Sequence, residues 1–223
     1  MQTQIKVMVL IGAVVLVAAF MGASYYRDSV QSERQPVALG DSPLVRPDSA
    51  TLGPADAPVI LVEFLDPECE SCSEFSPRIK KLLKDYDGKI RFVVRYMPLH
   101  TNSVAAAVVT EAAGEQGRYW EMQELLFRRQ AEWGAGHGSP SVGHAPPIAL
   151  FESYAVELGL DVNKLRNSIT QNRHALKVDR DRRDGQSLGV TKTPTFFVNG
   201  RMLARFSEED LRSLINEELG NQR

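Results

Sequence analysis

A short stretch that carries two cysteines constrains the fold of this chain more than any other feature. Cys69 and Cys72 are the only cysteines among 223 residues, and two residues separate them. An apolar run at 59–65 precedes them, and apolar residues at helical spacing follow over 75–86. This order predicts a buried strand that leads into a helix, with Cys69 at the mouth of that helix.

The predicted position of the cysteines favours redox chemistry. The first turn of a helix has unpaired N–H groups and the positive end of the helix dipole, and both stabilise a thiolate at Cys69. Cys72, one turn further on, is placed to attack a mixed disulfide at Cys69 and to release the bound partner. Such a pair carries two electrons by itself, so the sequence predicts no cofactor.

Two structural interpretations of the cysteines are weaker. A disulfide across so short a loop constrains little of the unfolded chain. A structural zinc site needs two further ligands, which must be histidines because no other cysteine exists. The histidines are His100, His137, His144 and His174. The spacing of His137 and His144 fits no usual zinc finger, so we expect no metal.

The N-terminal segment has the composition of a membrane anchor. No charged residue occurs from Val7 to Tyr26, a run of 20 residues. A helix of that length spans about 30 Å, close to the hydrocarbon thickness of a bilayer. We therefore predict a cytoplasmic tail at 1–6 and a transmembrane anchor, or uncleaved signal, at 7–26. A cleaved signal peptide is the alternative, with Gly22-Ala23-Ser24 as a passable cleavage site.

The side of the membrane follows from weaker signals. Positive charges are nearly balanced, with Lys6 before the span and Arg27 and Arg34 after it. A redox cysteine pair suits an oxidising compartment. We therefore expect a single-pass protein of a bacterial-type inner membrane, with its catalytic domain on the periplasmic side.

Composition limits the remaining possibilities. The net charge is −2 and the pI is about 6.1, so nothing indicates nucleic-acid binding. Residues 27–50 lack apolar periodicity and contain three prolines, which predicts a flexible linker. The folded domain is expected to begin at Thr51.

Glu63 interrupts the apolar run at 59–65. It could be an outward-facing residue at a sheet edge, or a buried carboxyl group behind the cysteines. We favour burial, because the neighbouring Val62 and Phe64 need covering on the opposite face of the strand. Burial would raise the pKa of Glu63 and allow it to exchange protons with Cys72.

The middle of the chain is expected to be helical. A second strand is predicted at 90–97, and no strand pattern occurs from about 101 to 188. A Gly- and Pro-rich loop at 130–147 divides the helical patterns. The last of these, 173–188, is dense in charge, which predicts a solvated face.

The chain then returns to strand-forming sequence. Phe196 to Val198 predict a strand, and Asn199-Gly200 predicts a hairpin turn into a second strand at 202–206. Ser207 is predicted to cap a final amphipathic helix.

Three motifs together resemble a known family. They are VEFLDPECESC at 62–72, Met97-Pro98-Leu99-His100, and TKTPTFFVNG at 191–200. In this order they resemble the DsbA-like branch of the thioredoxin-like superfamily. The resemblance implies an α/β thioredoxin fold, with a mixed central sheet flanked by helices. It assigns 51–99 and 189–223 to the thioredoxin-like domain and 100–188 to a helical insertion.

The resemblance also implies roles for individual residues. Cys69 would be the exposed nucleophile and Cys72 the buried resolving thiol. Pro194 would follow a cis peptide bond and face the cysteines, and Thr193 would offer backbone hydrogen bonds to an extended substrate. Glu63 falls where many DsbA-like proteins carry a buried acid.

One departure from the family affects the expected redox potential. Strong oxidants of the family place Pro-His between the cysteines, whereas this chain has Glu70-Ser71 there. Carboxylates at Glu68 and Asp66 lie close by in sequence and oppose ionisation of Cys69. We therefore expect a milder oxidant than a Pro-His protein.

The sequence thus predicts an extracytoplasmic protein thiol–disulfide oxidoreductase. Its partners would be proteins with thiols or disulfides, a membrane redox protein that recycles the cysteines, and the bilayer through 7–26. The direction of net transfer is left open. The alternatives are a membrane-tethered binding or chaperone module without redox turnover, and a metal-binding protein that uses the cysteines and loop histidines.

Overall fold

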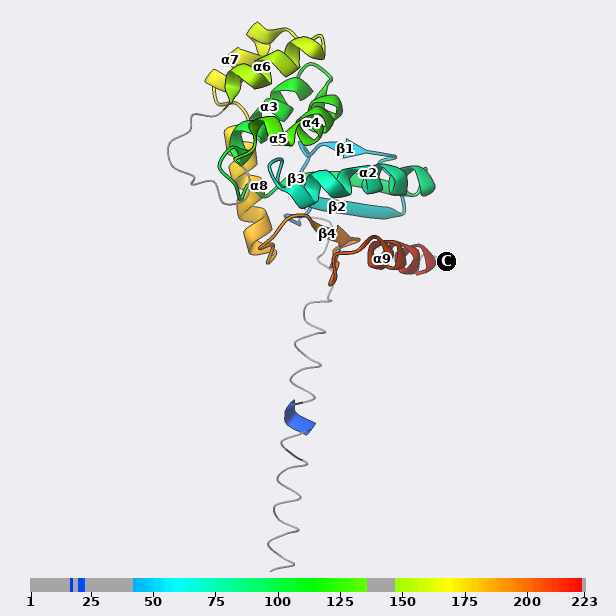
Figure 1. Cartoon of the computed structure of the whole chain (residues 1–223). Helices are drawn as coiled ribbons and strands as arrows, with labels where there is room; N and C mark the ends of the chain where they lie inside the picture. The colour runs from blue at the N-terminus through cyan, green and yellow to red at the C-terminus, as the bar shows by residue number, and fades with distance from the viewer. Residues whose placement is uncertain (1–16, 18–19, 23–41, 136–146, 222–223) are drawn as a thin grey trace, which may run out of the picture. The chain divides into compact units, whose positions relative to one another are not determined.

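The computed structural model of this chain (Figure 1) divides into two units, residues 1–36 and 37–223. Each is treated by itself. The residues that the structure describes are 17, 20–22, 42–135 and 147–221.

In the first unit, Val17 and residues 20–22 are helical. The predicted tail at 1–6, most of the predicted anchor at 7–26 and most of the linker at 27–50 lie outside the described residues. Within the described ranges, no helix is both long and apolar enough to cross a bilayer.

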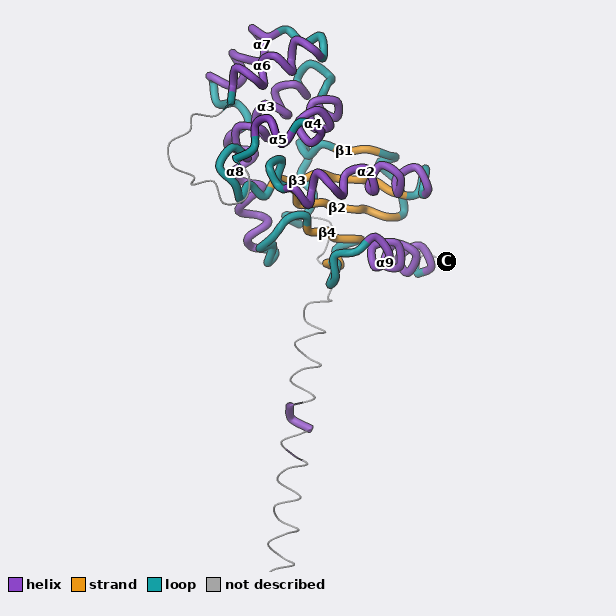
Figure 2. The backbone as a smooth tube through the Cα atoms, viewed as in Figure 1, coloured by secondary structure: helices purple, strands orange, loops and turns teal. Residues whose placement is uncertain are grey.

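The second unit is built on a five-stranded sheet with the order β1-β3-β2-β4-β5. Its central strand β2 runs parallel to β3 and antiparallel to β4, and β1 and β5 pair antiparallel at the two edges (Figure 2). The mixed sheet predicted from the sequence is confirmed. The strands are β1 (Thr51–Leu52), β2 (Val59–Leu65), β3 (Ile90–Tyr96), β4 (Thr195–Val198) and β5 (Arg201–Met202).

Six helices are described between β3 and β4, and the described parts of 100–188 contain no strand, as expected. All but the last of them contribute to a core of their own, which includes Met122, Trp133 and Phe151. Helices α6 and α7 lie at the top of Figure 1. The helices are α3 (Ser103–Gly114), α4 (Tyr119–Arg128), α5 (Gln130–Trp133), α6 (Ile148–Glu157), α7 (Val162–Thr170) and α8 (Ala175–Ser187).

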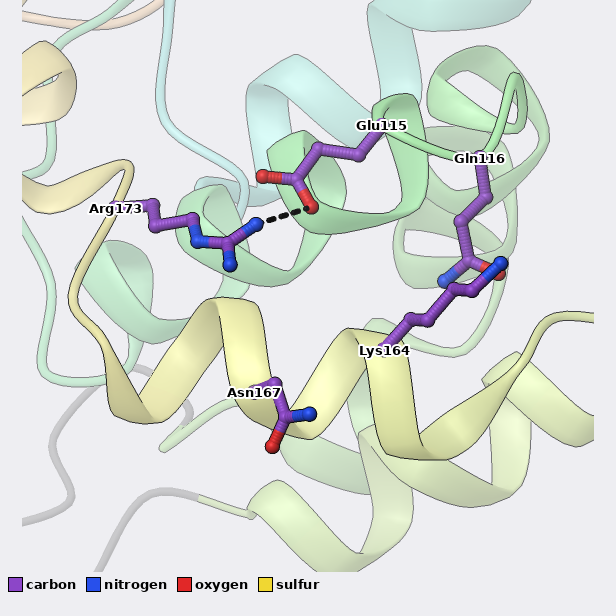
Figure 3. A pocket seen from close by; sticks show the side chains of 5 residues that line it. All are labelled: Glu115, Gln116, Lys164, Asn167 and Arg173. Atoms are coloured by element: carbon purple, nitrogen blue, oxygen red, sulfur yellow. Dashed lines mark ion pairs between the residues drawn. The ribbon is translucent and has the colours of Figure 1, made fainter.

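A polar hollow of about 460 Å³ opens among these helices (Figure 3). Glu115 and Arg173 face each other across it, with 3.6 Å between their charged atoms. Its lining residues are Glu115, Gln116, Lys164, Asn167 and Arg173. None of these is among the residues predicted for the redox site.

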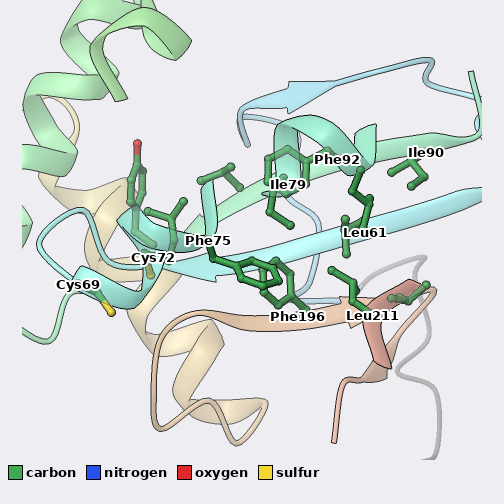
Figure 4. Close-up of a cluster of buried hydrophobic side chains, with 14 of the residues drawn as sticks. Leu61, Cys69, Cys72, Phe75, Ile79, Ile90, Phe92, Phe196 and Leu211 are labelled. Carbon is green, nitrogen blue, oxygen red and sulfur yellow. The ribbon is translucent and has the colours of Figure 1, made fainter. Parts of the chain in front are cut away.

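Helices α2 (Glu70–Asp85) and α9 (Glu208–Gly220) cover one face of the sheet. Phe75 and Ile79 of α2 and Leu211 of α9 pack there against Leu61 and Phe196 (Figure 4). Side chains alternate along a strand, so Glu63 shares this face with Leu61. The fold therefore directs Glu63 toward the helix that follows the cysteines.

The opposite face of the sheet is covered by α8 and by the segment 42–50. Leu44 is fully buried in a cluster with Phe64 and Phe197. Gly185 of α8 comes so close to the sheet that a Cβ atom there would lie 3.0 Å from the Phe64 ring. The folded domain therefore begins before the predicted start at Thr51, because Leu44 already packs into its core.

The charge-dense helix predicted to have only a solvated face contains a buried ion cluster. Asp181 and Asp184 lie three residues apart on α8, so both reach the same neighbour. Nη2 of Arg95, on β3, lies 2.8 Å from Asp181 and 2.6 Å from Asp184. The side chains of Arg95 and Asp181 are 0% exposed. The prediction of a solvated face was wrong for Asp181 and Asp184, because both carboxylates pair with the buried Arg95 of β3.

The second hairpin strand is shorter than predicted. Instead of 202–206, β5 covers only Arg201–Met202. The N–H of Leu203 still donates to Phe196 O at 2.8 Å, and the chain then turns toward α9. Ser207 caps that helix by accepting from the N–H of Asp210 at 3.0 Å, which confirms the predicted cap.

The buried ion cluster generates a stability prediction. Arg95→Met removes the only fully buried cation beside Asp181 and Asp184 within the described chain. It leaves the buried Asp181 without its 2.8 Å partner, while Asp184 keeps Arg46. We expect a loss of about 3–5 kcal/mol in the free energy of unfolding. Urea denaturation measures it.

The matched control for this change is Arg166→Met. Arg166 makes two hydrogen bonds to Glu152, both 2.8 Å long, but this pair lies on the surface. Its removal should change stability far less. Equal losses in the two variants would contradict a special role for the buried cluster.

Candidate active site

The two cysteines lie at the N-terminal end of α2 (Figure 4). Cys69 is the N-cap residue, with an extended backbone (φ −75°, ψ 121°), and Cys72 lies in the first turn. No side chain caps this helix, and a backbone hydrogen bond from Cys72 in its first turn lowers the pKa of Cys69. Cys69 is 8% exposed and Cys72 is 0% exposed. Cys72 is buried as expected, but Cys69 is buried too and is only the less buried of the two, because the chain on either side of the helix start covers it; the exposed position expected for Cys69 is not observed.

The loop before β4 meets the outer cysteine. The Cys69 thiol donates to the carbonyl oxygen of Thr193 at 3.3 Å, although the two residues lie 124 positions apart in sequence. The Thr193–Pro194 peptide bond is cis. The structure therefore brings together Cys69, Cys72, Thr193 and Pro194, which the sequence analysis grouped in one site.

The pKa values of the two thiols are shifted in opposite directions. A hydrogen bond from Cys72 is the largest influence on Cys69, and with a second from the Thr193 side chain it lowers the pKa of Cys69 to about 6 despite partial burial. Burial, followed by the hydrogen bond to Cys69, raises the pKa of Cys72 well above its usual range. Near neutral pH the pair therefore holds one thiolate, on Cys69.

The expected effect of nearby carboxylates is only partly present. The charge of Asp66 raises the pKa of Cys69, in the direction predicted. Glu68 is 6% exposed and is occupied elsewhere: it accepts from the backbone N–H of Asn102 at 2.6 Å and of Ala135 at 2.7 Å. Glu68 thus ties the start of α3 and the end of α5 to the residue before Cys69. Nothing in the sequence distinguishes Glu68 from a surface acid.

Glu63 is buried behind the cysteines, with 5% of its surface exposed. On the sheet it stands between two apolar residues, Val94 of β3 and Phe196 of β4. Burial, and next the charge of Cys69, raises the pKa of Glu63 to about 8. The charge of Glu63 in turn raises the pKa of Cys72. Glu63 is therefore a neutral acid near pH 7, close enough to the inner thiol to affect its ionisation.

The motif Met97-Pro98-Leu99-His100 also reaches the site, through Asp66. Asp66 is 0% exposed. Its Oδ2 accepts from the N–H of Leu99 at 2.7 Å and lies 2.7 Å from Nδ1 of His100. The sequence analysis used this motif only as a mark of the family and gave His100 no role in redox chemistry.

The described residues contain no group of three or more His, Cys, Asp and Glu side chains arranged to hold a metal ion. His137 and His144, the loop histidines of the metal-binding alternative, lie outside the described residues.

Comparison of the sequence with known proteins places the chain in a family. The family model described as thioredoxin matches residues 46–217. The chain is 38% identical over 152 residues to the Na⁺/H⁺ antiporter NhaA 1 of Salinispora arenicola, a match over 67% of this chain and 21% of that protein. It is 34% identical over 151 residues to the antiporter NhaA of Herminiimonas arsenicoxydans, over 68% and 22%. The chain thus spans about a fifth of the length of these curated relatives.

Solved structures give the same fold. Oxidised BdbD from Bacillus subtilis is 26% identical, with a TM-score of 0.67 over 77% of this chain and 93% of that one. A thioredoxin-like oxidoreductase from Silicibacter pomeroyi is 24% identical, with a TM-score of 0.67 over 82% and 99%. The thiol–disulfide exchange protein α-DsbA2 from Wolbachia pipientis is 22% identical, with a TM-score of 0.63 over 78% and 89%.

A strand, a cysteine pair at the start of the following helix and a facing Thr-Pro loop on a mixed sheet define a thioredoxin-type fold. The chain belongs to the thioredoxin family, and among the solved structures it resembles the DsbA-like thiol–disulfide exchange proteins.

The buried acid generates a pH prediction. The pKa of Glu63 is about 8 in the folded protein, against 4.5 for the free side chain. The stability that this group contributes is complete below about pH 4.5 and is lost as pH rises toward 8, by roughly 3–5 kcal/mol. Glu63→Gln cannot ionise, so its stability should fall less over this range. Urea unfolding of the reduced protein at a series of pH values measures the difference.

Glu209→Gln on the exposed face of α9 is the control, and it should follow the wild-type curve. If Glu63→Gln also followed the wild-type curve, Glu63 would not be a buried neutral acid.

Proposed function

We propose that this chain is a protein disulfide oxidoreductase that exchanges disulfides with protein substrates through Cys69 and Cys72. The observation that carries the proposal is the geometry of two neighbouring cysteines at one helix end, the outer one against the Thr193 carbonyl and the inner one fully buried. This geometry shifts the pKa values of the two thiols in opposite directions. A low-pKa outer thiol is a good leaving group and is ionised at neutral pH, whereas a buried high-pKa thiol stays protonated until it acts. An inert cysteine pair needs neither property.

In the oxidising direction, a substrate thiolate attacks Sγ of Cys69, and the Cys69–Cys72 disulfide breaks. Cys72 leaves as a thiolate and takes a proton, for which the neutral Glu63 is the neighbouring donor. A second substrate thiolate then attacks the substrate sulfur of the mixed disulfide and releases Cys69 as a thiolate. Two electrons pass from the substrate to the cysteine pair, and the reverse sequence reduces a substrate disulfide.

Thr193 and Pro194 are proposed to bind the substrate chain. Thr193 lies within hydrogen-bonding distance of the reacting sulfur, so a peptide joined to Cys69 passes beside this loop. Backbone groups of Thr193 offer hydrogen bonds to an extended peptide of any sequence. The cysteine pair itself carries the electrons, and the proposal therefore includes no cofactor.

We further propose that the domain works outside the cytoplasm, tethered to a bacterial-type inner membrane by residues 7–26. The apolar composition of that segment and the preference of disulfide chemistry for oxidising compartments support this placement. A membrane redox protein would then restore the cysteine pair after each turnover.

A trapping experiment tests the proposed reaction. Cys72→Ala leaves the nucleophile but removes the thiol that resolves the mixed disulfide, so substrates should remain bound to Cys69 through disulfides. Non-reducing gels of the full chain in its native membrane should show adducts that a dithiol reductant releases.

The control for trapping is the double variant with Cys69→Ser and Cys72→Ala, which should form no adducts. Full activity in Cys69→Ser alone would instead identify a binding or chaperone module without redox turnover.

The redox potential gives a second test. Because Glu70-Ser71 places no histidine between the cysteines, and the charge of Asp66 acts against the Cys69 thiolate, we propose that the reduced form is less stabilised than in a protein with Pro-His there. We expect equilibration with a glutathione series to give a lower potential than such a protein. A potential as high as that of the strong oxidants would contradict this expectation.

A further inference from the structure

A histidine–carboxylate pair stands beside the cysteines, outside the proposed redox machinery. Asp66 is 0% exposed and lies between β2 and α2. Its Oδ1 accepts from the N–H of Glu68 at 2.8 Å, and its Oδ2 contacts Leu99 N and His100 Nδ1, each at 2.7 Å. Two backbone donors and one imidazole thus hold this buried carboxylate in place.

This carboxylate is closely linked to the outer cysteine. The carbonyl oxygen of Asp66 accepts from the N–H of Cys69 at 3.1 Å, so the two residues form one tight turn. The negative charge of Asp66 acts against a thiolate on Cys69. A buried negative charge this close would hinder the chemistry unless a cation offset it.

His100 is the side chain placed to offset this charge. Its side chain is 36% exposed, so it can exchange protons with solvent. The hydrogen bond to Asp66 is the largest influence and raises the pKa of His100, and the charges of Asp66, Cys69 and Glu68 act in the same direction against partial burial. On the α3 side, the backbone N–H of His100 donates to Oγ of Ser103 at 3.1 Å, which fixes the residue.

We propose that protonated His100 offsets the buried charge of Asp66 and thereby stabilises the thiolate of Cys69, which makes His100 a positioning residue for disulfide exchange. The proposal rests on the proposed function only in taking Cys69 as the reacting thiol. In this proposal the cation near the thiolate is His100, which lies in the connection between β3 and α3 and not between the two cysteines.

The interaction must be reciprocal. If His100 stabilises the Cys69 thiolate, then the thiolate stabilises the protonated imidazole by the same free energy. Oxidation to the Cys69–Cys72 disulfide removes the thiolate charge. His100 should therefore hold its proton more tightly in the reduced protein than in the oxidised protein.

Three variants separate charge from hydrogen bonding. His100→Gln can still donate a hydrogen bond to Asp66 but carries no charge, whereas His100→Lys keeps the charge and loses the imidazole. The control is His174→Gln, because Nε2 of His174 makes a similar contact with Glu115, 2.9 Å long, in the helical segment. Circular dichroism establishes that each variant is folded.

The first readout is the titration of Cys69 in the reduced protein, followed by thiolate absorbance and by the alkylation rate against pH. In His100→Gln we expect alkylation below about pH 6 to be about tenfold slower than in the wild type. His100→Lys and His174→Gln should react at close to the wild-type rate. A wild-type rate in His100→Gln, or equal slowing in His100→Gln and His100→Lys, would overturn the proposal.

The second readout is the proton affinity of His100 itself, measured by NMR titration of its ring in reduced and oxidised protein. The titration midpoint of His100 should be higher in the reduced form. An equal midpoint for His100 in both forms would overturn the proposal.

These measurements also keep the two proposals apart. The reduced-state titration needs no substrate or turnover. A Cys69 titration that depends on the charge at residue 100, in a protein that forms no mixed disulfides, would uphold the role of His100 and refute the proposed function. If the protein forms mixed disulfides but the titration of Cys69 does not depend on the charge at residue 100, the proposed function is upheld and the role of His100 is refuted.

Discussion

The hydrogen bond between the two thiols at the start of α2 is the interaction on which the site depends. It holds the pKa of Cys69 at about 6 only because Cys72 keeps its proton, and Cys72 keeps its proton because it is buried. The apolar packing of α2 against β2 therefore does more than stabilise the fold, since it creates the difference between two chemically identical groups. Glu63 extends that difference, because a neutral acid beside the inner thiol can supply a proton there.

Much of this arrangement could be predicted from the sequence because it follows from local order. The thiols are placed by a strand, two cysteines at helical spacing and an amphipathic helix. Side chains alternate along the strand at 59–65, which places Glu63 on the face of the sheet that this helix covers. The loop with Thr193 and Pro194 could be placed only through the family resemblance. No local pattern indicates that a segment 124 residues later will meet Cys69.

What escaped prediction depends on partners distant in sequence. Asp181 and Asp184 look like surface charges until Arg95 is brought to them by the sheet. Leu44 lies in a proline-containing stretch without apolar periodicity, and it is ordered through its packing in the cluster around Phe64. Glu68 and His100 likewise take their roles from contacts between separate connections. Charge and composition read along the chain carry no sign of such contacts.

The segment 42–50 determines how a mechanical load would enter the domain. Nη1 of Arg95 donates to the carbonyl oxygen of Pro43, and the Arg46 guanidinium binds Asp184 of α8 through two hydrogen bonds, 2.8 and 2.9 Å long. Any pull on the chain before residue 42 would first strain these contacts, which lie on the face of the sheet opposite to α2. A load on residue 42 would thus pass first to β3 and α8, on the face of the sheet opposite to α2.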